Sequence, residues 1–152
     1  MTTTERPSSP TVRTDVVPVV TRAGQEDAET AQSGDCVRVS GVGPKHTPAT
    51  KIWFGQVSNM PGYRSLPHHH GEAETGGYIL RGEGRIYYGD GYKQYIDMTA
   101  GDWVFVPPYM PHVEANMSTT DELVWLTTRT PDNIVINLGD VDDSELEGFR
   151  RS

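Results

Sequence analysis

The residues best suited to chemistry gather in two short segments of this 152-residue chain. The first segment, residues 62–82, contains three consecutive histidines followed within four residues by two glutamates. The second, residues 101–116, contains a further histidine in a strand-like stretch framed by prolines. Imidazole and carboxylate are the usual protein ligands of divalent transition metals. Together the two segments predict a metal-binding site.

The spacing of the histidines indicates which of them act together. On an extended strand His68 and His70 project from one face, whereas His69 points the other way. Glu74 follows after three residues, which leaves room for a turn that returns its carboxylate to the same face. His112 lies on a later strand that a barrel can bring opposite the first pair. Three imidazoles and one carboxylate leave two positions open on an octahedral ion, and open positions distinguish catalytic or ligand-binding sites from closed structural ones.

Short strands must position these side chains. β-favouring segments recur from residue 51 onward and are separated by Gly, Pro and Asp turns, the pattern of an all-β sandwich or barrel. We expect His68–His70 to lie in or beside one strand. The other strands are expected at residues 36–40, 52–58, 78–81, 85–88, 93–98, 102–106, 112–116, 122–128 and 134–137.

Composition excludes several classes of protein. The formal net charge of −8 and the lack of a basic stripe argue against nucleic-acid binding, because phosphate contacts need clustered Lys and Arg. Cys36 is the only cysteine, so no intrachain disulfide can form and a reducing cytoplasm is the expected compartment. No apolar run approaches the ~20 residues that span a membrane, so no membrane partner is expected.

The first segment resembles the first conserved motif of the cupin superfamily. That motif reads Gly, five residues, His-x-His, three or four residues, Glu, six residues, Gly. The matching residues are Gly62, His68, His70 and Glu74, and the closing glycine, Gly82, comes one residue late. Counting back from that glycine instead puts Thr75 in the glutamate position. The resemblance therefore leaves two candidates for that position.

The second segment resembles the second cupin motif: Gly, five residues, Pro-x-Gly, two residues, His, three residues, Asn. Tyr109 replaces the inner glycine, and the matching residues are Gly101, Pro107, His112 and Asn116. Two motifs at the right separation make the resemblance specific over about residues 50–130. It implies a single-domain double-stranded β-helix, or jelly-roll barrel. It further implies a metal bound by His68, His70, Glu74 and His112.

The resemblance also suggests a domain organisation. Residues 1–34 are expected to be a largely flexible leader, residues 35–139 the cupin barrel and residues 140–152 an acidic tail. Single-domain cupins often dimerise through N-terminal strands, and residues 16–20 could supply one. We therefore expect a homodimer that takes a small-molecule substrate.

An open metal site in an apolar barrel favours one of two chemistries. Our first prediction is an oxygenase or dioxygenase with Fe(II), acting on a small organic metabolite that could be aromatic. The alternative is an isomerase, decarboxylase or lyase in which Mn(II), Ni(II) or Zn(II) acts as a Lewis acid on a hydroxy acid or sugar acid. A third reading is a non-catalytic module that binds a small ligand. In the hypothesis of a Lewis-acid isomerase, decarboxylase or lyase, Glu74 or Glu114 would move protons. The carboxylate of the substrate could then be bound by Arg64, Arg81 or Arg85.

Each of these residues also has a purely structural interpretation. The histidines could be surface residues in a turn, and Glu72 is best interpreted as a solvated loop charge. Glu114 alternates onto the face of His112, so it could be a second carboxylate near the metal or a solvated residue at the barrel mouth. Asn116 is expected to hold a turn or a strand end. The large aromatic residues are expected to pack in the barrel, and one or two of them could line a substrate pocket: Trp53, Trp103, Tyr109 and Trp125.

Overall fold

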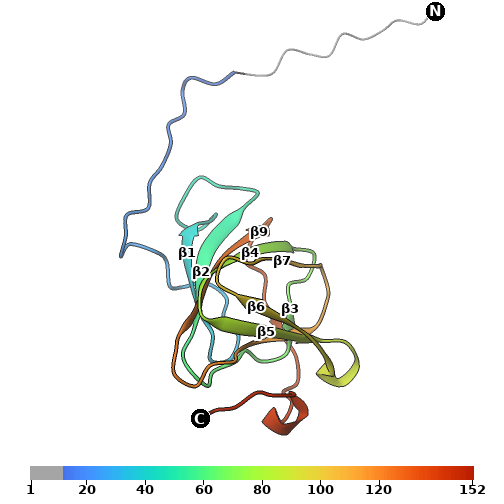
Figure 1. Cartoon of the computed structure of the whole chain (residues 1–152). Helices are drawn as coiled ribbons and strands as arrows, with labels where there is room; N and C mark the ends of the chain where they lie inside the picture. The colour runs from blue at the N-terminus through green and yellow to red at the C-terminus, as the bar shows by residue number, and fades with distance from the viewer. Residues whose placement is uncertain (1–11) are drawn as a thin grey trace, which may run out of the picture.

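The computed structural model describes residues 12–152, and this part of the chain folds into two five-stranded antiparallel sheets that face each other (Figure 1). The first sheet has the order β1 (Val37–Val42), β2 (Trp53–Asn59), β9 (Leu123–Thr130), β4 (Glu74–Arg81), β7 (Trp103–Val106). The second has the order β10 (Ile136–Asn137), β3 (His68–His69), β8 (His112–Asn116), β5 (Glu83–Tyr88), β6 (Gln94–Thr99). Two single-turn 3₁₀ helices, η1 (Asp90–Tyr92) and η2 (Asp143–Glu145), are the only helices in this part of the chain. The predicted all-β fold is confirmed.

The space between the sheets is divided into an apolar part and a polar part. Alternating residues of the strands point inward, as the period of two requires. The apolar part is a cluster of eight buried side chains: Cys36, Val57, Ile79, Ile86, Met98, Val106, Leu123 and Trp125. The polar part contains His68, His70 and His112, and all three are almost fully buried. The fold therefore encloses the predicted site instead of presenting it on a surface turn.

Two strands of the first sheet direct arginines inward. In β1, Arg38 is 0% exposed, whereas the neighbouring Val37 is 55% exposed. In β9, Arg129 is 1% exposed and lies on the same inward face as Thr127. Both guanidinium groups consequently enter the polar half of the barrel.

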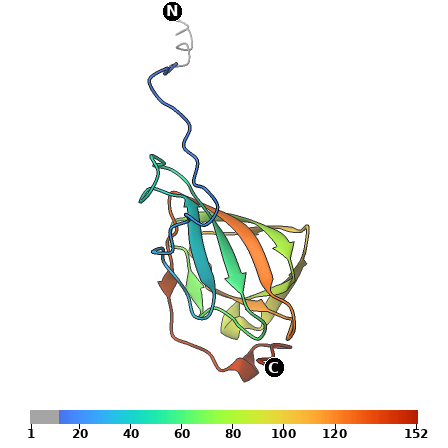
Figure 2. The same ribbon diagram turned by 90° about the vertical axis from the view of Figure 1, so that its left-hand side faces the viewer.

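The outer faces of the two sheets differ in what covers them. Leu146 and Phe149 of the C-terminal segment pack on Tyr87 and Val113 of the second sheet. Figure 2 shows this segment at the base of the barrel. The outer face of the first sheet carries Trp103, which is 80% exposed. The two sheets thus have different surroundings, and the acidic tail is an ordered part of the fold.

The predicted leader lies partly outside the described residues, because its first eleven residues are not described. Within residues 12–34, Asp27 pairs with Ser40 and Ser33 pairs with Cys36, so residues 27–33 lie against the barrel. Residues 16–20 form no strand within residues 12–152, and the dark-blue stretch that begins at residue 12 lies away from the barrel in Figure 2. The expected homodimer strand stays a prediction. Within residues 12–152, no helix has the length and apolar character needed to cross a membrane.

Two glycines with nearly the same backbone conformation provide a matched test of local packing. Gly82 has φ +96° and Gly101 has φ +93°. A Cβ at Gly82 would lie 2.6 Å from the carbonyl oxygen of Glu122, whereas a Cβ at Gly101 would meet nothing within 4 Å. We expect Gly101→Ala to lower the free energy of unfolding by about 1–2 kcal/mol through backbone strain alone. Gly82→Ala should cost at least about 3 kcal/mol, because steric overlap adds to that strain.

Urea denaturation of the two variants beside the parent measures this difference. Equal losses of stability in both variants would contradict the role assigned to the close approach between Gly82 and Glu122.

Candidate metal centre

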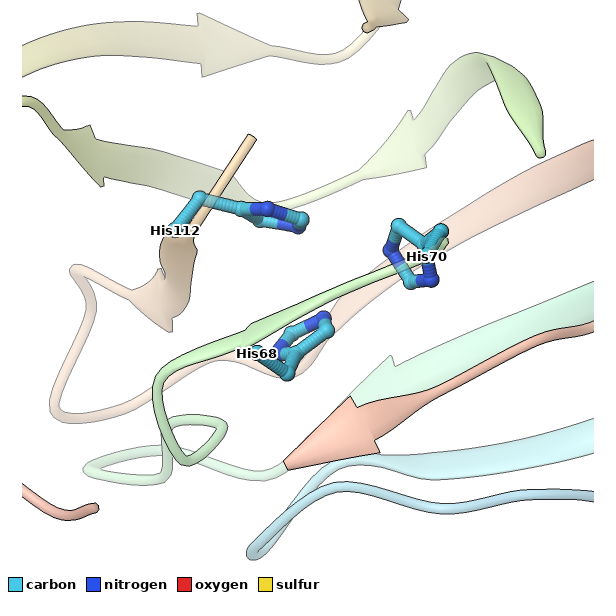
Figure 3. A group of neighbouring side chains, drawn as sticks. All are labelled: His68, His70 and His112. Carbon is cyan, nitrogen blue, oxygen red and sulfur yellow. The ribbon is translucent and has the colours of Figure 1, made fainter. Parts of the chain in front are cut away.

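Two adjacent strands of the second sheet bring the histidines together. His68 on β3 is the antiparallel partner of His112 on β8, so their side chains lie on the same face of the sheet. His70 follows β3 and is on the same side as His68, as the two-residue spacing predicts. Figure 3 shows the three rings directed into the same interior space. One potential ligand atom from each histidine lies within 4.8 Å of the others.

The three imidazoles are closely packed and shielded from water. Their ring centroids are separated by 4.4 Å (His68–His112), 4.9 Å (His68–His70) and 5.1 Å (His70–His112). None is more than 1% exposed. His69 is half-buried outside this group, and its Nδ1 accepts a hydrogen bond from the amide of Gly71. The prediction that His69 points away from His68 and His70 is therefore confirmed.

Backbone carbonyl groups fix the orientation and tautomer of all three rings. The Nδ1 atoms lie 2.8 Å from Leu66 O for His68, 2.7 Å from Ile134 O for His70 and 2.9 Å from Met110 O for His112. A carbonyl oxygen can only accept, so Nδ1 carries the proton and Nε2 keeps its lone pair. This is the usual support of histidines that bind a metal through Nε2.

Burial keeps the three histidines neutral. It is the largest cause that lowers the pKa of His68, His70 and His112 below the ordinary value, and nearby positive charges from Arg38 and Arg129 act in the same direction. Neutral imidazole is the form that binds a metal. The electrostatics of the barrel therefore maintain the ligand form of all three side chains at neutral pH.

This depression of the pKa predicts acid sensitivity of the metal-free protein. The folded state holds the imidazoles neutral, whereas histidines of the unfolded chain bind protons below a pKa of about 6.5. Their contribution to stability is therefore complete above about pH 6.5 and is lost progressively as the pH falls below it. The loss should reach up to about 1.4 kcal/mol per histidine for each pH unit.

Urea denaturation of the metal-free protein between pH 7.5 and pH 5 tests this expectation. The variant His70→Asn removes one of the three histidines, so it should reduce the slope of the unfolding free energy against pH by about one third. A slope that stays the same in this variant would show that other groups cause the acid sensitivity.

The glutamate predicted as the fourth ligand lies outside the cluster. Glu74 is exposed at the start of β4, and the next residue, Thr75, is 2% exposed and faces the interior. The structure therefore agrees with the motif counted back from Gly82, which puts Thr75 in the glutamate position. The predicted roles of Glu74 as metal ligand and proton carrier do not fit this geometry. Glu72 is also exposed, as expected of a loop charge.

The buried carboxylate near the histidines belongs to Glu114. It is 1% exposed, forms an ion pair with Arg38 and has Oε1 3.6 Å from His68 Nε2. A position at the barrel mouth is therefore wrong for this residue. It is the only aspartate or glutamate that is buried within residues 12–152. Its inward direction follows from alternation along β8, which places Glu114 on the same face as His112.

Two arginines complete the surroundings of the cluster. Arg38 Nη2 lies 3.5 Å from His68 Nε2, and Arg129 Nη2 lies 3.2 Å from His70 Nε2. Arg129 also donates to Thr75 Oγ1 at 3.1 Å, and burial lowers its pKa to about 9. Neither arginine was predicted from the sequence, because alternation along a strand does not specify which of its faces is buried.

The arginines that were expected to clamp a carboxylate lie elsewhere. Arg64 is held by Asp140 and Asp143 of the C-terminal segment. Arg81 is exposed and pairs with Glu122, and Arg85 pairs with Asp97. All three hydrogen-bond networks are separate from the histidine cluster, so none of these arginines supports the proposed clamp.

The large aromatic residues divide into two groups. Trp53 and Trp125 are buried in the barrel, and the guanidinium of Arg129 lies 5.5 Å from the Trp53 ring centroid. Trp103 and Tyr109 are 80% and 66% exposed, so they do not line the interior. The side chain of Asn116, at the end of β8, donates hydrogen bonds to the carbonyl groups of residues 59 and 121. This agrees with a role in holding the end of that strand.

Comparison with known proteins identifies the family. Residues 56–129 match the family model described as the cupin domain, and this range includes all three clustered histidines. Over these residues the chain belongs to the cupin superfamily. A comparison with curated protein sequences finds no match to this cupin.

Solved structures share the double-stranded β-helix. A cupin-like protein of Thermotoga maritima has a TM-score of 0.66 at 19% identity, over 85% of this chain and 97% of its own. An uncharacterised protein with a double-stranded β-helix domain from Klebsiella pneumoniae has a TM-score of 0.59 at 16% identity, over 74% and 92%. Oxalate decarboxylase of Bacillus subtilis, described with Mn(II) centres, has a TM-score of 0.59 at 21% identity. The aligned region covers 74% of this chain but only 30% of the longer oxalate decarboxylase chain. Sequence identities this low show a shared fold alone.

The residues of the cluster fit a divalent metal. Three neutral imidazoles present lone pairs to one another, and within residues 12–152 His112 Nε2 has no hydrogen-bond partner. A buried polar atom without a partner is costly, which indicates that a ligand completes this site. Imidazole donors suit iron, nickel, copper and zinc. Arg38 and Arg129 oppose a cation electrostatically, so the ion must be accompanied by negative charge.

Proposed function

We propose that this cupin is a metal-dependent oxygenase of a small organic metabolite. The observation that carries the proposal is the donor set: three buried, neutral imidazoles with no glutamate ligand from β4. Three protein ligands leave half of an octahedral coordination sphere open for substrate and O₂, as the two-histidine, one-carboxylate sites of non-haem Fe(II) oxygenases also do. Fe(II) held there would supply the one-electron chemistry that O₂ requires, which side chains alone do not provide.

The residues of the chain have distinct parts in this proposal. His68, His70 and His112 hold the metal through Nε2, while their Nδ1–carbonyl hydrogen bonds keep the rings in place. The burial of all three excludes bulk water from the reacting groups. Glu114 is the group able to hold or accept a proton, because its carboxylate lies beside His68.

The positions of the aromatic side chains bear on which substrate we propose. The expectation of an aromatic substrate depended on several Trp and Tyr side chains facing the barrel interior. Of these, Trp103 and Tyr109 are on the outside and Trp125 is part of the apolar cluster, which leaves Trp53 as the one buried beside Arg129. We therefore propose a small polar substrate and do not retain the aromatic ring as a requirement.

Oxygen uptake tests this function. The metal-free protein is reloaded with Fe(II) and supplied with a panel of small 2-hydroxy acids, 2-oxo acids, diketones and catechols in an oxygen electrode. We expect uptake with at least one compound, and its loss in His112→Ala. Absence of uptake over the whole panel with a fully iron-loaded protein would overturn the oxygenase.

A second candidate function is a non-redox decarboxylase, isomerase or lyase. The observation that favours it is Glu114, a buried carboxylate beside the cluster that could move a proton during Lewis-acid chemistry. The likeness in fold to an oxalate decarboxylase with Mn(II) centres is compatible with this candidate. Turnover under strict anaerobiosis with Mn(II), Ni(II) or Zn(II), abolished by Glu114→Gln, would distinguish it from the oxygenase.

A further inference from the structure

The interior of the barrel carries more positive than negative charge. Arg38 and Arg129 are 0% and 1% exposed, and Glu114 is the only buried carboxylate within residues 12–152 that can oppose them. Burying a charged group is costly unless it is paired and hydrogen-bonded. One guanidinium of the two is therefore left without a carboxylate partner.

The interior around Arg38 and Arg129 also contains more hydrogen-bond donors than acceptors. Within residues 12–152, Arg38 Nε and Nη1 are buried and have no hydrogen-bond partner. Arg38 and Arg129 each direct an Nη2 atom at a histidine Nε2, the atom that a metal would need. Guanidinium groups bind carboxylates through two parallel hydrogen bonds, and this geometry makes Arg the preferred residue for such anions. The missing partner is thus an acceptor that carries negative charge.

We propose that the barrel binds a small carboxylate between Arg38 and Arg129, beside the three histidines, and that carboxylate and metal bind cooperatively. The cooperative half depends on the proposed metal site. A divalent ion would add two positive charges to a site that already has an excess and receives no glutamate from β4. A carboxylate supplies the negative charge and offers the guanidinium groups acceptors in place of the Nε2 lone pairs. The carboxylate thus lowers the positive charge that opposes the metal, and the metal adds positive charge that attracts the carboxylate.

Thermodynamic linkage makes this coupling reciprocal: the factor by which metal tightens carboxylate binding equals the factor by which carboxylate tightens metal binding. Couplings of this kind typically amount to about 5–150-fold in affinity. The substrate of the enzyme is accordingly assigned to the small carboxylic acids, which include members of the panel named above.

Titration calorimetry of the full chain with malonate tests the inference. Malonate is a small dicarboxylate without other functional groups, and malonamide is its neutral counterpart. The titrations are carried out on metal-free and Co(II)-loaded protein, with correction for malonate bound to free metal. We expect malonate to bind at least about 5-fold more tightly to the loaded protein. Malonamide should bind to neither form.

Arginine variants show whether the binding occurs at the proposed place. Arg129→Gln should weaken malonate binding by about 10–100-fold, the value of hydrogen bonds to a charged group. Arg129→Lys retains the charge and provides a second variant if the glutamine variant folds poorly. Arg81→Gln, on the exposed surface, should bind malonate like the parent.

The outcomes separate this inference from the proposed function. Binding of metal in a His112-dependent manner without any binding of malonate overturns the inference and leaves the metal site intact. Arg129-dependent malonate binding by a protein that takes up no metal supports the carboxylate site, overturns the cooperativity and contradicts the metal-dependent function. Malonate binding that is equal in parent and both Arg129 variants overturns the inference.

Discussion

His112→Ala should abolish stoichiometric metal binding. The imidazole of His112 is fully buried and belongs to the group of three whose ligand atoms lie within 4.8 Å of one another. Loss of groups that only support a ligand already weakens metal binding by about 10–100-fold, so removal of a ligand should exceed about 100-fold. Plasma mass spectrometry of untagged protein, before and after dialysis, measures the metal content of each chain.

Two matched variants control this experiment. His69→Ala removes the neighbouring imidazole outside the cluster, and Glu74→Gln removes the exposed carboxylate once expected to be a ligand. Both should retain about one metal ion per chain. Loss of metal in Glu74→Gln would contradict the three-histidine site and restore the glutamate to it. Equal metal content in His112→Ala and the parent would contradict the site altogether.

Arg38→Met should destabilise the metal-free protein by about 3–5 kcal/mol, because it leaves the buried carboxylate of Glu114 without its cationic partner. Urea denaturation at pH 7 measures the change in the free energy of unfolding. The double variant Arg38→Met with Glu114→Gln should recover a large part of the loss, since it removes both charges. Additive losses in the double variant would show that the ion pair does not couple the two residues.

The exposed pair between Arg81 and Glu122 serves as the control. The Arg81 side chain is 67% exposed, and exposed ion pairs typically contribute no more than about 1 kcal/mol. Arg81→Ala should therefore change the stability only slightly. A loss as large as that of Arg38→Met would show that the position in the barrel does not determine the effect.

The fold was predictable because its signal repeats along the chain. Nearly every expected strand between residues 36 and 137 is present, with Gly and Pro turns between them. The pairing of His68 with His112 follows from two sequence motifs whose spacing holds in three dimensions. The cluster of three histidines was thus predictable from sequence alone, whereas the carboxylate beside it was not.

The contents of the barrel were less predictable, because an alternating pattern specifies the period of a strand and not which face is buried. In the stretch Val37–Ser40 the alternation indicates a strand, and its buried side chains are the polar Arg38 and Ser40. A buried arginine is stable only beside partners contributed by distant strands, here Glu114, and these partners cannot be recognised locally. The same reasoning explains the one-residue choice between Glu74 and Thr75.

X-ray absorption spectroscopy of the protein as purified, at the edge of the metal it contains, tests the central claim most directly. The account predicts three imidazole ligands with metal–nitrogen distances of about 2.0–2.2 Å and the remaining positions filled by oxygen atoms from solvent or a small anion. A spectrum with two or fewer imidazoles, or with sulfur in the coordination sphere, would contradict a metal held by His68, His70 and His112.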